Sequence, residues 1–164
     1  IGENNQCPKI IKDRLFRFHL VDNVRGQTLP FAPEEIKVAN LSTKITGLNR
    51  KEIIIEISGR SKAIAKGPWL LGENIWTPAH DLDHEINTSV LGNATFDLRS
   101  NEFVKFELVA ICEWRGKTEN NGRKFGPERG RIGILYDMAD NSHVNRIAPT
   151  FIDQYNATWI EQPD

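Results

Sequence analysis

Apolar residues alternate with polar ones along much of the chain, which is the pattern of strands with one buried face. The longest example runs from residue 101 to 116. Six of its apolar residues share one face: Val104, Phe106, Leu108, Ala110, Cys112 and Trp114. A strand of about 12 residues spans roughly 40 Å. Strands of this length are typical of curved antiparallel sheets, in sandwiches or barrels.

Shorter segments repeat this alternation and predict further strands at 14–21, 35–45, 51–59, 92–98 and 131–138. In the first of them Phe16, Phe18 and Leu20 are predicted to share the buried face, with Arg17 and His19 opposite. Turn-forming residues at 97–101 predict that 92–115 is a hairpin. The strand at 131–138 is predicted to pair beside it.

Few segments of the chain show the apolar spacing of an amphipathic helix. Residues 148–160 are predicted to form a short C-terminal helix, because Pro149 suits a first turn and Phe151, Tyr155 and Trp159 are spaced along one helix face. We therefore predict a single all-β domain over residues 1–164, an antiparallel β-sandwich or β-barrel with at most one or two short helices. Its first ten residues are expected to form a loosely ordered arm.

The composition is that of a globular domain. The 164 residues are enough for one domain with a hydrophobic core, and 39% of them are hydrophobic and 26% charged. The net charge of −1 offers no overall field that attracts nucleic acid or an anionic membrane. No apolar run reaches the roughly 20 residues that span a bilayer. We expect neither a nucleic-acid partner nor a membrane span.

The two cysteines and the glycosylation motifs bear on location. Cys112 falls in an apolar strand and is expected to be a core thiol, with a disulfide to Cys7 as the alternative in an exported chain. Roughly one N-x-[ST] motif is expected by chance, but four occur. They begin at Asn40, Asn87, Asn93 and Asn156. The excess favours a secreted or periplasmic protein over a cytoplasmic one.

Charge is unevenly distributed, and a basic, glycine-rich segment at 115–131 follows an acidic one at 67–98. Arg115, Arg123 and Arg129 are candidate anion ligands, because arginine binds carboxylate or phosphate with two hydrogen bonds and glycine lets backbone N–H groups approach. Trp69 and Trp76 lie in the acidic segment and could serve as platforms for a flat ligand such as a sugar ring. The alternatives are solvated charges and tryptophans that cover the core.

A cluster in the acidic segment combines His80, Asp81, Asp83 and His84. Imidazoles and carboxylates at this density, without nearby Lys or Arg, could bind a divalent metal ion. The cluster lacks both the Glu that follows the first His in zinc-protease motifs and the glycine of a calcium loop. We favour a solvated loop here and expect no cofactor, with a divalent metal ion as the alternative.

The chain has no nucleophile motif of the Gly-x-Ser-x-Gly type. We therefore predict a non-enzymatic binding or accessory module, exported and part of a larger assembly. Its partner would be a protein, or a small anionic or carbohydrate ligand. One alternative is a metal-assisted hydrolase or lyase that uses His80 and His84. The other is a lipocalin-like carrier with an interior cavity.

Overall fold

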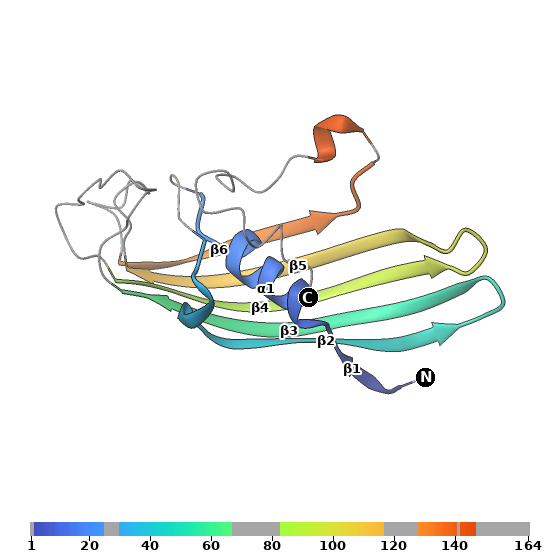
Figure 1. The fold of residues 1–164 in the computed structure, drawn as a ribbon, viewed down its shortest axis with the longest axis horizontal. Coiled ribbons are helices and arrows are strands. Elements are labelled where there is room, and N and C mark those ends of the chain that lie inside the picture. Colours follow the sequence, from blue (N-terminus) through green and yellow to red (C-terminus); the bar gives the residue numbers. More distant parts are fainter. Residues whose placement is uncertain (1, 25–29, 67–82, 117–127, 141, 147–164) are drawn as a thin grey trace.

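The fold is built on one antiparallel sheet whose six strands follow one another in chain order (Figure 1). A computed structural model describes residues 2–24, 30–66, 83–116, 128–140 and 142–146. The strands are β1 (Asn4–Gln6), β2 (Ile36–Leu48), β3 (Glu52–Ala65), β4 (His84–Asp97), β5 (Glu102–Gly116) and β6 (Arg129–Asp137). The helices are α1 (Lys9–Arg14), a π-helical segment (Leu15–His19) and two 3-10 turns (Pro33–Glu35 and His143–Arg146).

Side-chain hydrogen bonds close the two tight hairpins at one end of the sheet. Asn49 Oδ1 accepts from the backbone N–H of Lys51 at 2.8 Å between β2 and β3. Between β4 and β5, Asp97 Oδ1 accepts from the N–H of Arg99 at 2.6 Å, and Asn101 has a positive φ of 59°. Asn and Asp are the residues that support such turns. The predicted hairpin at 92–115 is confirmed, and β6 pairs beside it as expected.

The core lies between one face of the sheet and the N-terminal helical segment, which crosses that face (Figure 1). Phe16 and Leu20 are 1% and 0% exposed, and they belong to one core cluster with residues of β2 to β6. The predicted buried face of β5 is confirmed. Leu108, Ala110, Cys112 and Trp114 are buried, and Phe106 is partly buried against them. Both cysteines are free thiols.

The prediction of a strand at 14–21 is wrong, because this segment continues α1 as a π-helical turn. Phe16 and Leu20 are four residues apart, a spacing that puts two side chains on the same face of a strand and on the same face of a helix alike. The helix also gains an ion pair between Lys9 and Asp13 on its exposed side. The Tyr136 hydroxyl of β6 donates to the His19 carbonyl at 2.7 Å and ties the segment to the sheet.

The all-β antiparallel prediction is confirmed, with one short α-helix among the described residues. The finer choice between a sandwich and a barrel stays a prediction. Within the first ten residues, β1 pairs with β2. The predicted C-terminal helix at 148–160 lies outside the described residues. No helix in the described ranges combines the length and apolar character needed to cross a membrane.

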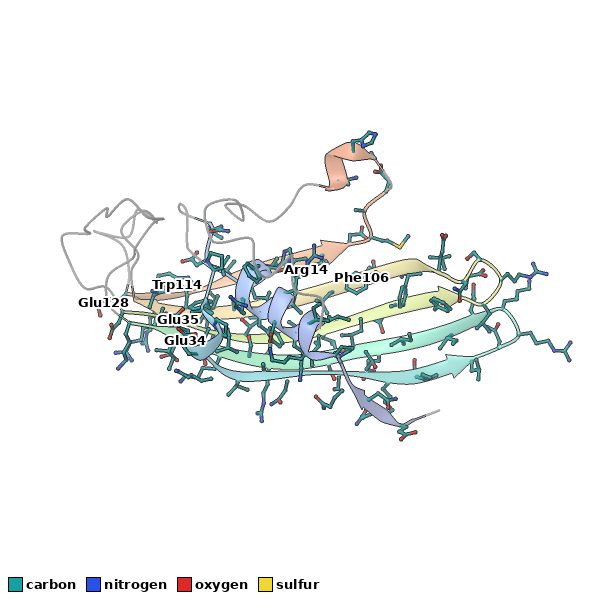
Figure 2. The ribbon with its side chains drawn as sticks, in the orientation of Figure 1. Arg14, Glu34, Glu35, Phe106, Trp114 and Glu128 are labelled. Atoms are coloured by element: carbon teal, nitrogen blue, oxygen red, sulfur yellow. The ribbon has the colours of Figure 1, made fainter. Side chains whose placement is uncertain are left out.

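The face of the sheet opposite the core carries no described element and is called the open face below. Its residues alternate with the core residues along β3, β4 and β5. Figure 2 shows Trp114 and Glu128 at one end of the sheet, with Phe106 farther along β5 toward the hairpin turns. Rows of side chains that cross the open face can therefore be ordered from the Trp114 end to the hairpin end.

Candidate functional site

The open face gathers cations at the Trp114 end of the sheet. In an antiparallel ladder, residues directly opposite one another form rows of neighbouring side chains. The ladders place eight charged or polar side chains in adjacent rows there, which we call the basic end: Arg60, Lys62, Glu85, Asn87, Glu113, Arg115, Arg129 and Arg131. Five cations against two carboxylates give this end a formal charge of +3.

Both carboxylates of the basic end are held by neighbours. Glu113 Oε1 accepts from Nε and Nη2 of Arg131 at 2.9 and 2.6 Å. Glu85 Oε1 accepts from the Asn87 amide at 2.7 Å and lies 3.0 Å from the Lys62 ammonium. These contacts, the Asn87 hydrogen bond first, lower the pKa of Glu85. Glu85 is thus suited to positioning cations at neutral pH rather than to exchanging protons, and Glu113 positions Arg131.

Three cations of the basic end are exposed: Arg60, Arg115 and Arg129. Arg60, Arg115 and Arg129 have no ion pair or side-chain hydrogen bond to any residue that the structure describes. Arg115 faces Arg129 directly across the β5–β6 ladder and faces Glu85 on its other side. Two like charges in directly opposite positions repel one another. An anion placed between Arg115 and Arg129 would relieve that repulsion.

Two adjoining hollows, both open to solvent, follow these cations across the sheet. One, about 560 Å³, extends from Arg60 to Ile111. The other, about 420 Å³, extends from Arg115 to Arg129. Asn87 and Glu113 are among the lining residues of both hollows. The shared residues join the two hollows into one groove that is open to solvent. Cations lie along this groove, and the hydrogen-bonding side chains of Asn87 and Glu113 lie between them.

The structure brings together only part of the predicted anion site. Arg115 and Arg129 become direct neighbours because β5 and β6 form a ladder. Arg123 lies outside the described residues, as do Trp69 and Trp76, so their role in ligand binding stays a prediction. Arg60 and Lys62 were not predicted as site residues, and Arg131 was counted in the basic segment at 115–131 but not named as a ligand. Alternation along the chain places Arg60 and Lys62 on one face of β3. Only the strand register shows that Arg131 of β6 lies on the same face of the sheet.

The two described members of the predicted metal cluster, Asp83 and His84, lie at this end of the sheet. His80 and Asp81 are outside the described residues, so the convergence of His80 and His84 stays a prediction. Asp83 is exposed just before β4. His84 begins β4 and lies on the core side, where its ring centroid is 5.3 Å from that of Phe31. Within the described ranges, no group of three or more His, Cys, Asp or Glu side chains is arranged to hold a metal ion.

An apolar row crosses the open face next to the basic end and was likewise not predicted as functional. Leu91, Val109 and Leu135 stand directly opposite one another on β4, β5 and β6 and are 61%, 46% and 70% exposed. The available signal was Val109 and Ile111, two apolar residues on the β5 face that otherwise carries charged residues from Lys105 to Arg115. Comparisons of the chain with protein-family models, with curated proteins and with solved structures found no match.

Proposed function

We propose that the protein is a non-enzymatic binding module, a subunit of a larger assembly, which binds carboxylate groups of a protein partner at the basic end of the open face. One observation carries the proposal: Arg115 and Arg129 lie exposed and directly opposite one another beside a groove. A carboxylate accepts two hydrogen bonds from one guanidinium and adds charge attraction, so two adjacent arginines suit an acidic surface.

The shape of the groove supports a macromolecular partner over a small ligand. Small-molecule sites bury most of the ligand, whereas this groove is open to solvent and runs across several strands. The carboxylate of Glu85, which is paired with Lys62, supports binding rather than proton transfer. A general acid or base works best with a pKa near the working pH, and the pKa of Glu85 is lowered.

Fluorescence anisotropy with a labelled oligoglutamate peptide tests the proposal. We expect binding that weakens as salt is raised, because exposed charges are screened within about 10 Å at 0.1 M salt. The double substitution Arg115→Glu, Arg129→Glu should weaken binding at least about tenfold, a difference of about 1.4 kcal/mol.

The matched control is Arg50→Glu, Arg99→Glu, which makes the same charge change on exposed residues of the two hairpin turns. We expect it to change the affinity less than about twofold, because these residues stand at the far end of the sheet. An oligoglutamine peptide should not bind. Equal losses in the two double variants, or no binding of oligoglutamate to the unaltered protein, would refute the proposal.

A further inference from the structure

The open face is charged with opposite sign at its two ends. At the hairpin end the ladders place eight charged side chains on this face, which we call the acidic end: Lys44, Glu52, Glu56, Asp97, Glu102, Lys105, Glu107 and Asp137. Six carboxylates against two lysines give a formal charge of −4. The row of Leu91, Val109 and Leu135 separates this end from the basic end.

We infer that the partner is a second copy of this chain, docked open face against open face with its strands antiparallel to those of the first. This inference rests on the proposed function, since it makes the acidic end of one copy the carboxylate surface that the basic end of the other binds. A twofold axis makes such an interface self-complementary. In one such dimer, each basic end faces an acidic end, so the charges of both ends have partners of opposite sign.

The positions of the charges select one orientation of the two copies. With the twofold axis along the row of Leu91, Val109 and Leu135, this row meets its own copy and each basic end meets an acidic end. With the axis along the strands instead, basic end would meet basic end and acidic end would meet acidic end. Like charges brought together across an interface are unfavourable, so the first orientation is selected.

The size of the open face suits a stable dimer. Strands β3 to β6 are about 19 Å wide together, and the 13 residue steps from Glu102 to Arg115 extend roughly 43 Å, which gives an area of about 800 Å². A standard protein interface buries about 800 Å² on each partner. The apolar residues stand at the centre and the charges toward the ends, which is the usual anatomy of such an interface. Two sheets packed in this way would lie about 10 Å apart.

Sedimentation velocity between about 1 µM and about 100 µM protein tests the inference at low and high salt. We expect a monomer–dimer equilibrium in which Leu135→Lys weakens dimerisation at least about tenfold, because it places a charge near its symmetry mate. Leu48→Lys is the matched control. Leu48 is 57% exposed and stands opposite Ile53, on the core side of the sheet, so this variant should dimerise like the unaltered protein.

Charge reversal at one end tests the orientation. Arg115→Glu, Arg129→Glu makes both ends acidic, and Glu102→Lys, Glu107→Lys removes the net charge of the acidic end. Each double variant should dimerise at least about tenfold more weakly than the unaltered protein, whereas a mixture of the two should form heterodimers. Homodimers of either variant as tight as those of the unaltered protein would overturn the orientation.

The outcomes separate this inference from the proposed function. A protein that stays monomeric but binds oligoglutamate overturns the second copy as partner and leaves the proposed function standing. A protein that neither dimerises nor binds the peptide refutes both. A dimer that Leu135→Lys leaves intact uses another surface, which also overturns the inference. If the inference holds, oligoglutamate competes with dimerisation and shifts the equilibrium toward monomer.

Discussion

Leu108→Ala is the most informative test of how the core is packed. Leu108 is 2% exposed and covers Gly92, the residue directly opposite on β4. Its Cδ1 would lie 2.7 Å from a Cβ built on Gly92. Because Gly92 has no side chain that could move into the vacated space, and ladders hold β5 on both sides, we expect the cavity to stay largely open.

The expected cost follows from the atoms removed and the space left. Loss of three buried carbon groups costs about 2.4 kcal/mol at about 0.8 kcal/mol each. A cavity of about 70 Å³ adds about 1.7 kcal/mol at about 24 cal/mol per Å³. The free energy of unfolding should therefore fall by about 4 kcal/mol. Gly92→Ala should not restore it, because the new Cβ would collide with the Glu107 carbonyl oxygen.

Equilibrium unfolding in urea, followed by circular dichroism, measures this loss. Val109→Ala is the matched control, because Val109 is the next residue of the same strand but is 46% exposed on the open face. At low protein concentration, where self-association adds nothing, it should cost less than about 1 kcal/mol. A cost for Leu108→Ala below about 0.5 kcal/mol, or a larger cost for Val109→Ala, would show that the faces of β5 are assigned the wrong way round.

Three further predictions concern single positions. Gly116→Ala should destabilise the protein by more than about 1 kcal/mol in urea, since Gly116 has a φ of 91° and a Cβ there would collide with the Asp83 carbonyl. Burial lowers the pKa of His19, so the free energy of unfolding should fall as pH drops below about 6.5, and His19→Gln should remove this part of the pH dependence. The pKa of Glu85 is also lowered, so its contribution is present above about pH 4.5 and is lost as pH falls through the folded-state value. In acid titrations followed by circular dichroism, Glu85→Gln should flatten that loss; an unchanged curve would show that the contacts of Glu85 add no stability.

The sequence by itself determined the hairpin at 92–115, the strand at 131–138 and the inward face of β5. Alternation with period two is a local property, and turn-forming residues at 97–101 separate the members of the hairpin, so both are readable without the fold. Leu108, Ala110 and Cys112 are buried as this pattern indicates. Arg115 and Arg129 were predicted to be anion ligands from their residue type and the basic, glycine-rich segment around them, and that role stays a prediction.

Only the tertiary structure decided the helical start of the chain and the layout of the open face. Phe16 and Leu20 both belong to the core cluster, and because their four-residue spacing fits a helix as well as a strand, only packing against the sheet decides between the two. The charges at the two ends of the open face come from strands far apart in the chain, such as β3 and β6. Their grouping depends on the ladder register, and a shift of one residue would turn every side chain of a strand to the other face.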